Sequence, residues 1–338
     1  MGLYQDVGID LGTANTLVYV RGKGVVVREP SVVAVDQQSG QMLAFGDEAY
    51  RMLGRTPGHI VATRPMRDGV IADYAVTEAM LRHYVAKAIG RHSLFRPRLM
   101  VCVPSGITTV ERRAVVEAAT QAGARRTYLI EEPLAAALGA GLDISLPTGN
   151  MVLDIGGGTT DIAVLSLNGI VLSTSVRVGG DSLNDAVIRW VKREHNLLIG
   201  ERTAEEVKIR VGTALPAAPG RGEVDVRGRD LVTGLPKTIT VASRDAHAAM
   251  EDQLREMVDL VRSVLERTPP ELSSDILDHG LVMTGGGALL HGLDHLIADE
   301  TGIPVAVAED ALSCVAIGTG KALAGIQILE RDLVAAGH

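Results

Sequence analysis

The stretch that decides the fold is residues 7–16, which read VGIDLGTANT. An apolar run leads to Asp10, a glycine-containing turn with hydroxyl side chains follows, and apolar residues return after it. This pattern indicates a strand, a tight turn and a second strand. It recurs at residues 152–161, which read VLDIGGGTTD. Two copies of one hairpin predict a duplicated domain that holds a nucleotide between its halves.

The residue types in the two turns suit a phosphate chain. Glycine lets the backbone approach a phosphate, and successive N–H groups in such a turn form an anion-binding concavity. Asp10 and Asp154 would repel phosphate, but they suit Mg²⁺, which takes carboxylates and usually keeps several waters. The alternative is a pair of ordinary glycine-rich hairpins. The turn residues that we predict to bind nucleotide are Gly12, Thr13, Ala14, Asn15, Gly156, Gly157, Gly158 and Thr159.

Length and composition exclude several classes of protein. The 338 residues, 46% of them apolar, can fill the cores of two domains. A net charge of −8 and 3% aromatic residues argue against a general nucleic-acid surface, so no nucleic-acid partner is expected. Cys102 and Cys314 lie in or near apolar segments and indicate buried free thiols in a reducing compartment. Without a signal peptide or a long apolar run, the protein is expected in the cytoplasm.

Apolar strands alternate with amphipathic helices, which indicates an α/β fold. Thr108 and Glu111 form the capping box of one helix, and a long helix is expected over about 246–267. Residues 220–241 alternate around turn signals at Gly228 and Gly234, which predicts a small β-rich insertion. Residues 30–65 similarly indicate an inserted subdomain. We therefore expect two large subdomains that carry the nucleotide clamp, each with a smaller insertion.

These motifs resemble those of one known family, MreB with its Mbl and MreBH relatives. These are bacterial actin-like proteins of the actin/Hsp70/sugar-kinase superfamily, and the resemblance runs essentially end to end. Residues 64–73 and 228–237 point to MreB in particular. The matching stretches are 10–16 (DLGTANT), 64–73 (RPMRDGVIAD), 102–106 (CVPSG), 130–137 (IEEPLAAA), 154–160 (DIGGGTT) and 228–237 (GRDLVTGLPK).

The resemblance implies an actin-like, ribonuclease H-like fold with duplicated domains around a central nucleotide cleft. Subdomain IA would comprise residues 1–30 and 66–145, IB 31–65, IIA 146–180 and 242–338, and IIB 181–241. The implied activity is slow ATP hydrolysis with Mg²⁺, coupled to membrane-associated filaments that organise cell-wall synthesis and maintain rod shape. The implied partners are other copies of the chain, in head-to-tail protofilaments and antiparallel pairs, the inner membrane surface, and MreC and RodZ. The implied location is cytoplasmic, peripheral on the inner face of the membrane.

The resemblance also assigns the chemistry of hydrolysis. Glu132 would face the terminal phosphate and orient the attacking water, with Thr159 close to it and Glu131 as the second candidate. From the residues alone, the pair of acids before Pro133 could merely begin a helix. Residue 161 is Asp where many relatives have Glu, and we expect little consequence because both are acidic. A small-molecule kinase or another ATPase of the superfamily is the alternative function, although a kinase needs an Asp as base.

Two further segments are assigned to the nucleoside. Thr203 and Glu206 form a capping box, and by resemblance this helix contacts adenosine through Glu205, Glu206 and Lys208. An ordinary exposed helix start is the alternative for this segment. A third glycine-rich turn resembles the loop that passes under the adenine and the α-phosphate. Its residues are Gly285, Gly286, Gly287 and Ala288.

Leu94 and Phe95 form an apolar pair in a loop flanked by Arg91, Arg96 and Arg98. An apolar tip within a basic collar suits an anionic bilayer surface. MreB relatives carry a membrane-inserting loop at this place, so the resemblance implies that role here. The alternative is that both side chains pack under the sheet.

Overall fold

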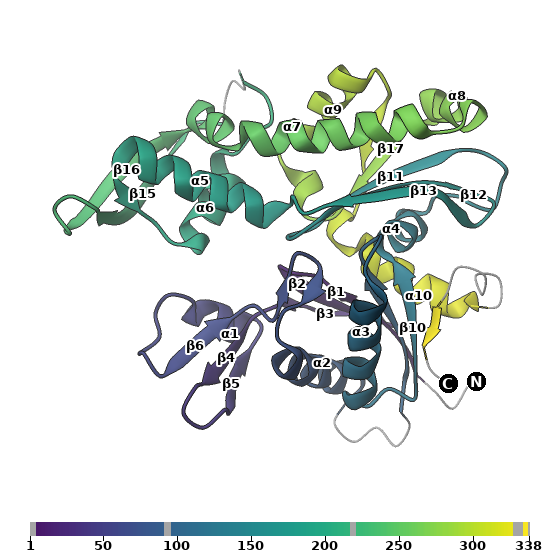
Figure 1. Cartoon of the computed structure of the whole chain (residues 1–338), viewed down its shortest axis with the longest axis horizontal. Helices are drawn as coiled ribbons and strands as arrows, with labels where there is room; N and C mark the ends of the chain where they lie inside the picture. Colours follow the sequence, from purple (N-terminus) through teal and green to yellow (C-terminus); the bar gives the residue numbers. More distant parts are fainter. Residues whose placement is uncertain (1–4, 91–95, 217–220, 327–333, 337–338) are drawn as a thin grey trace.

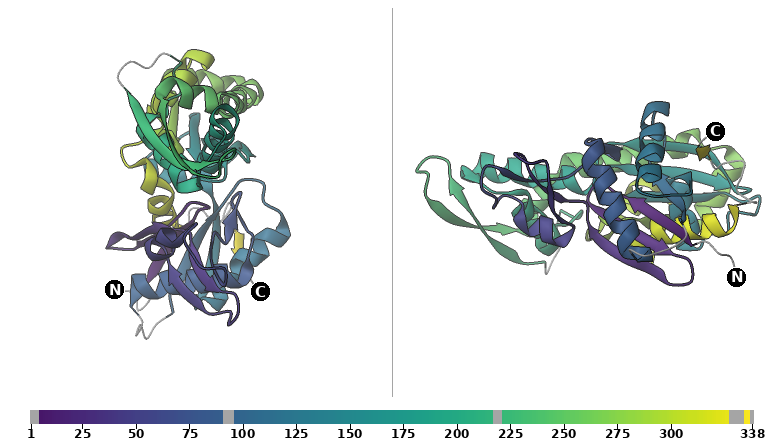
Figure 2. Two further views of the ribbon diagram at one scale, coloured as in Figure 1. Left: turned by 90° about the vertical axis from the view of Figure 1, so that its left-hand side faces the viewer. Right: turned by 90° about the horizontal axis from the view of Figure 1, so that it is seen from below.

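The structure is a computed structural model that describes residues 5–90, 96–216, 221–326 and 334–336. Two lobes lie one above the other, and each is built on one mixed sheet (Figures 1 and 2). We call the part with the six-stranded sheet the first lobe and the part with the five-stranded sheet the second lobe. The strand orders are β19-β10-β9-β1-β2-β3 and β13-β12-β11-β17-β18.

The two sheets share one topology. In the first lobe β1 pairs antiparallel with β2 and parallel with β9, and in the second β11 pairs antiparallel with β12 and parallel with β17. The predicted duplication is therefore confirmed. The first sheet comprises β1 (Asp6–Leu11), β2 (Asn15–Val20), β3 (Gly24–Pro30), β9 (Arg98–Val103), β10 (Arg126–Glu131) and β19 (Val334–Ala336). The second comprises β11 (Asn150–Ile155), β12 (Thr160–Ser166), β13 (Gly169–Val176), β17 (Leu281–Thr284) and β18 (Val305–Val307).

Helices α2 (Tyr74–Ile89) and α3 (Thr109–Gln121) belong to the first lobe. The predicted capping box is present at the start of α3. The Glu111 N–H donates to Thr108 Oγ1 at 3.2 Å, and the Thr108 N–H donates to Glu111 Oε2 at 2.7 Å. These two bonds satisfy N–H groups that the first turn of a helix leaves free.

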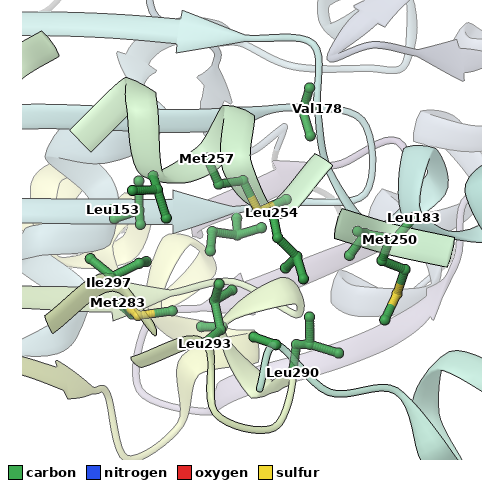
Figure 3. Packing of buried hydrophobic residues seen from close by; sticks show 14 of the residues in the cluster. Leu153, Val178, Leu183, Met250, Leu254, Met257, Met283, Leu290, Leu293 and Ile297 are labelled. Atoms are coloured by element: carbon green, nitrogen blue, oxygen red, sulfur yellow. The ribbon is translucent and has the colours of Figure 1, made fainter. Parts of the chain in front are cut away.

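The sheet of the second lobe is covered by α7 (Ser243–Arg267), α8 (Pro270–His279) and α9 (Leu293–Thr301), and α5 (Gly180–His195) packs against α7. The predicted long helix is α7, which begins three residues before the expected start at Ala246. Met250, Leu254 and Met257 are buried on its inner face, where they lie in the same core as Leu153 of β11 (Figure 3). This apolar stripe holds the helix against the sheet.

Each lobe carries a small insertion, and both insertions extend toward the same side of the molecule (Figures 1 and 2). The first insertion contains a sheet of order β5-β4-β6 with α1, and the second a sheet of order β14-β15-β16 with α6. The first comprises β4 (Val33–Asp36), β5 (Met42–Phe45), α1 (Asp47–Met52) and β6 (Ile60–Thr63). The second comprises β14 (Leu197–Leu198), α6 (Glu201–Val211), β15 (Glu223–Asp230) and β16 (Pro236–Ala242). The exact subdomain boundaries stay a prediction.

Gly234 lies in the turn between β15 and β16, as predicted. The prediction for Gly228 is wrong, because this residue lies inside β15 and pairs with Lys237 of β16. A Cβ at position 228 would lie 2.4 Å from the carbonyl oxygen of Leu198. Glycine is needed there because β14 approaches closely. The glycine at position 228 therefore indicates a close contact between strands, where we had predicted a turn.

The chain crosses between the lobes through two helices, α4 (Glu132–Ala140) and α10 (Cys314–Ala324). Helix α4 joins β10 to β11, and α10 lies between β18 and β19. Small residues bring the two helices into backbone contact. A Cβ on Gly318 would lie 1.7 Å from the Ala135 carbonyl oxygen, and one on Gly139 would lie 1.8 Å from that of Cys314. Cys102 and Cys314 are both buried free thiols, as expected.

Replacing Gly318 by alanine is expected to lower the free energy of unfolding by about 3 kcal/mol, because a methyl group cannot enter this contact without separating the helices. Gly58→Ala is the matched control. No atom lies within 4 Å of a Cβ at position 58, so we expect a change of at most about 0.5 kcal/mol there. Urea denaturation measures both, and equal midpoints for the two variants would contradict the close contact.

Candidate functional site

A cavity of about 370 Å³ lies between the lobes, a volume within the range of small-ligand sites. Both predicted phosphate loops line it, and so does the glycine-rich turn after β17. The predicted residues in its lining are Asp10, Gly12, Thr13, Ala14, Asn15, Glu132, Asp154, Gly156, Gly157, Gly158, Thr159, Glu205, Lys208, Gly285, Gly286 and Gly287. Glu131, Glu206 and Ala288 are not part of the lining.

The two phosphate loops touch one another across the cavity. A Cβ on Gly157 would lie 2.6 Å from the Cβ of Ala14, and one on Gly158 would lie 2.6 Å from Thr13 Oγ1. Glycine at both positions therefore permits the contact between the loops. The second loop is also fixed to the start of α5, since the Asp181 N–H donates to the Gly157 carbonyl at 2.8 Å.

A short hairpin of β7 (Met66–Arg67) and β8 (Val70–Ile71) adds a residue that sequence reasoning missed. Its turn residues Asp68 and Gly69 both have positive φ, and Gly69 lines the cavity. The Gly69 N–H donates to Thr13 Oγ1 at 3.0 Å. The Asp-Gly dipeptide signals such a turn, but nothing in the local pattern says that it would meet a phosphate loop. Gly180 and Asp181 were missed for the same reason.

The floor of the cavity is acidic. Asp10, Glu132 and Asp154 are deeply enclosed, and none of them takes part in an ion pair among the described residues. Burial raises the pKa of Asp10 to about 6. Burial and the nearby charge of Asp10 raise the pKa of Asp154 to about 7, and burial with neighbouring carboxylates raises the pKa of Glu132 well above its usual value. Such a site favours a bound cation.

Mg²⁺ fits this donor set. Asp154 Oδ1 already accepts a 2.8 Å hydrogen bond from Thr284 Oγ1, which orients its carboxylate, and Asp10 Oδ1 accepts from Cys102 Sγ at 3.3 Å. No three His, Cys, Asp or Glu side chains gather as direct metal ligands in the described part of the chain. Mg²⁺ usually keeps several waters and binds through one or two carboxylates and substrate phosphates, which suits these two aspartates.

The adjacent acids Glu131 and Glu132 point to different places. Glu132 is 8% exposed and lines the cavity. Glu131 Oε2 accepts a hydrogen bond from Ser105 Oγ at 2.8 Å, and its Oε1 lies 3.7 Å from the Arg112 guanidinium. Of the two, Glu132 is thus the carboxyl that can reach a ligand. Thr159, 5% exposed, lines the same cavity.

The predicted capping box at Thr203 and Glu206 is wrong, because α6 begins at Glu201 with Gly200 as N-cap and no side-chain cap. Glu206 is exposed and pairs with Arg210 at 3.4 Å on the outer face. Glu205 and Lys208 lie three residues apart on the face that lines the cavity. Lys208 Nζ donates to the Gly180 carbonyl at 2.9 Å, and burial lowers its pKa.

Two side chains of the first lobe contact α6 of the second insertion or the residues beside it. Arg64, which follows β6, donates from Nε and Nη2 to Glu201 Oε1 at 2.9 and 2.5 Å, and from Nη1 to the Ala14 carbonyl at 3.1 Å. The Tyr50 hydroxyl of α1 donates to Glu205 Oε2. Two side chains of the first lobe therefore hold α6, whose inner face lines the cavity.

The predicted membrane residues Leu94 and Phe95 lie outside the described residues. Within the part that the structure describes, no helix is both long and apolar enough to cross a bilayer.

Comparison with known proteins finds one family that matches nearly the whole chain. The family model described as MreB/Mbl protein matches residues 4–331. The cell shape-determining protein Mbl of Bacillus subtilis (strain 168) is 55% identical over 319 residues, which are 94% of this chain and 96% of that protein. The cell shape-determining protein MreB of Escherichia coli (strain K12) is 54% identical over 335 residues, covering 97% and 96% of the two chains.

Solved structures agree with this placement. The crystal structure of MreB 5 of Spiroplasma citri bound to AMPPNP superposes with a TM-score of 0.91 at 38% identity, covering 97% of this chain and 98% of that one. The ADP-bound structure of MreB5 gives 0.91 at 37% identity, over 97% and 99%. The MamK double helical filament, at 22% identity over 94% and 98% of the two chains, has a TM-score of 0.80 and shows the shared actin-like fold.

Proposed function

The chain belongs to the MreB/Mbl family, and from this premise we propose that it binds and hydrolyses ATP and assembles into filaments that determine cell shape. The observation that carries the proposal is the cavity in which the two phosphate loops, Gly12–Asn15 and Gly156–Thr159, meet beside the buried Glu132. The structures of MreB5 with AMPPNP and ADP support an adenine nucleotide as the ligand.

In the proposed reaction, water attacks the γ-phosphorus in line and the bond to the β–γ bridging oxygen breaks. The products are ADP, inorganic phosphate and one proton. Glu132 orients the water and Thr159 lies beside it, while backbone N–H groups of the two loops hold the phosphate chain. Asp10 and Asp154 would hold Mg²⁺ through waters, and the bound ion neutralises charge on the phosphate oxygens.

We extend the proposal to head-to-tail self-association. The turn between β15 and β16 carries exposed apolar side chains at the far end of the second insertion: Leu231 is 42% exposed, Val232 80% and Leu235 64%. An exposed apolar group of this kind favours a protein contact. Family membership supports antiparallel pairs, attachment to the inner face of the membrane, contacts with MreC and RodZ, and the organisation of cell-wall synthesis.

The test uses the purified full chain with ATP and Mg²⁺ on anionic vesicles. We expect vesicle-bound filaments in electron micrographs, pelleting that depends on ATP, and slow release of phosphate. Absence of filaments across a range of salt and magnesium concentrations would contradict the proposal. A screen of sugars in the same ATPase assay separates the alternative, because strong stimulation by one small molecule would indicate a kinase.

Replacing Arg64 by alanine is expected to accelerate nucleotide release about tenfold, because it removes charge-assisted hydrogen bonds that hold α6 over the cavity. Stopped-flow displacement of a fluorescent ATP analogue measures the rate. Arg210→Ala is the matched control, since Arg210 pairs with Glu206 on the exposed face of the same helix. An unchanged release rate in Arg64→Ala would show that the contact does not retain nucleotide.

A further inference from the structure

Ser105 lies outside the cavity lining, yet it connects the second lobe to the strand end that carries Glu132. It follows β9, and its side chain is buried, at 8% exposure. Its N–H donates to Asp161 Oδ1, on β12 of the second lobe, at 2.8 Å. Its hydroxyl donates to Glu131 Oε2, at the end of β10 in the first lobe, also at 2.8 Å. One residue thus makes a hydrogen bond to each lobe.

The local sequence explains this placement. Strand β9 ends at Val103, Pro104 has no N–H to continue the ladder, and Gly106 adopts a positive φ of 79°. The chain therefore turns away from the sheet at Ser105 and leaves its N–H free for Asp161. Asp161 is fully buried and pairs across strands with Asp154, so it is fixed within the second lobe.

Glu131 is held on both carboxylate oxygens. It is the N-cap residue of α4, with φ −72° and ψ 139°, but its side chain makes no cap hydrogen bond to the helix. It reaches Ser105 through Oε2, and its Oε1 lies 3.7 Å from the Arg112 guanidinium of α3. Since Glu132 is the next residue, the direction of its side chain depends on how this strand end is held.

We propose that Ser105 is a positioning residue for hydrolysis. It links Asp161 of the second lobe to Glu131, and Glu131 directly precedes Glu132, so the position of the second lobe affects the direction of the Glu132 side chain. The inference rests on the proposed ATPase function. A change in the angle between the lobes would move β12 relative to β9, and the two hydrogen bonds of Ser105 would pass this displacement to the start of α4. A displacement of about 1 Å of a group that orients a reactant can change a rate by about 100-fold. Hydrolysis is thereby made dependent on lobe closure.

The experiment compares kcat and KM for ATP in the wild-type chain and in Ser105→Ala, Ser105→Thr and Glu131→Gln. We expect kcat of Ser105→Ala to fall about tenfold with KM within about twofold of the wild type. Threonine retains the hydroxyl, so Ser105→Thr should recover kcat to within about threefold. The double variant Ser105→Ala/Glu131→Gln should be no slower than the slower single variant, because both changes act on one chain of contacts.

Ser145→Ala is the matched control, since Ser145 is an exposed serine whose hydroxyl donates to Asp143 away from the cleft. Its kcat should equal that of the wild type.

If the wild type hydrolyses ATP and Ser105→Ala has the same kcat, the inference fails and the proposed function stands. If Ser105→Ala and Ser105→Thr lose kcat equally, the role is structural and the inference is also overturned. If the wild type hydrolyses no ATP, the proposed function itself fails. Should Ser105→Ala not fold, a wild-type kcat in Glu131→Gln overturns the inference.

Discussion

Glu132→Gln is expected to lower the rate of ATP hydrolysis by about 100- to 1,000-fold while ATP affinity stays within about threefold. Glutamine keeps the shape of the side chain but lacks the carboxyl oxygen that orients and polarises the attacking water. Glu132 is buried and lines the cavity, and no described salt bridge involves it, so replacing its carboxyl breaks no ion pair of the fold. Phosphate release at saturating ATP measures the rate, and displacement of a fluorescent analogue measures the affinity.

The matched control is Glu117→Gln, an exposed position on α3 of the same lobe. We expect its rate and affinity to equal those of the wild type. Near-normal hydrolysis in Glu132→Gln would remove this residue from the reaction. A loss of ATP binding equal to the loss of rate would instead show that Glu132 acts in binding.

Asp154→Asn is expected to raise the stability of the nucleotide-free protein and to reduce its stabilisation by ligand. In the nucleotide-free protein the pKa of Asp154 is raised from 3.8 to about 7, chiefly by burial. A carboxyl whose pKa is higher in the folded state stabilises the fold at low pH, and that stability is lost as pH rises through the folded-state pKa. At pH 8 the ionised Asp154 therefore destabilises the nucleotide-free protein, by on the order of 2–4 kcal/mol. The neutral asparagine removes this cost.

With Mg²⁺-ATP the variant is expected to lose most of its stability advantage over the wild type. A ligand at 100 times its dissociation constant stabilises a protein by about 2.7 kcal/mol, and Asp154→Asn is expected to miss most of this gain because a carboxylate that holds the ion through water is replaced. Melting temperatures at pH 6 and pH 8, with and without Mg²⁺-ATP, test both parts. Asp252→Asn, on the exposed face of α7, is the control. Equal stabilisation of Asp154→Asn and wild type by Mg²⁺-ATP would contradict the metal role.

The duplicated hairpins could be predicted from sequence because their signal is local. An Asp, a glycine turn and flanking apolar runs fix the strands, and the strands fix where the turns lie. Helix boundaries were harder to predict. Because α6 begins at Glu201, with Gly200 as N-cap and no side-chain cap, the Thr203–Glu206 pattern pointed to the wrong start and the wrong face. Glu205 and Lys208 face the cavity, and Glu206 does not.

The residues that sequence reasoning missed share a different property. Gly69, Asp181 and Ser105 come from three separate segments, and each acquires its role only through contacts with residues far away in the chain. Their neighbours in sequence carry no phosphate-binding pattern. Tertiary contacts bring Gly69 and Asp181 to the cavity and place Ser105 between Asp161 and Glu131, so no local rule could have found them.

The most direct measurement is a crystal structure of this protein with Mg²⁺ and a non-hydrolysable ATP analogue. We expect the triphosphate between Gly12–Asn15 and Gly156–Thr159, the ion within water-mediated reach of Asp10 and Asp154, and the Glu132 carboxylate directed at the γ-phosphate. A nucleotide held by one lobe alone, or an ion remote from both aspartates, would contradict the claim that the two lobes bind one nucleotide together.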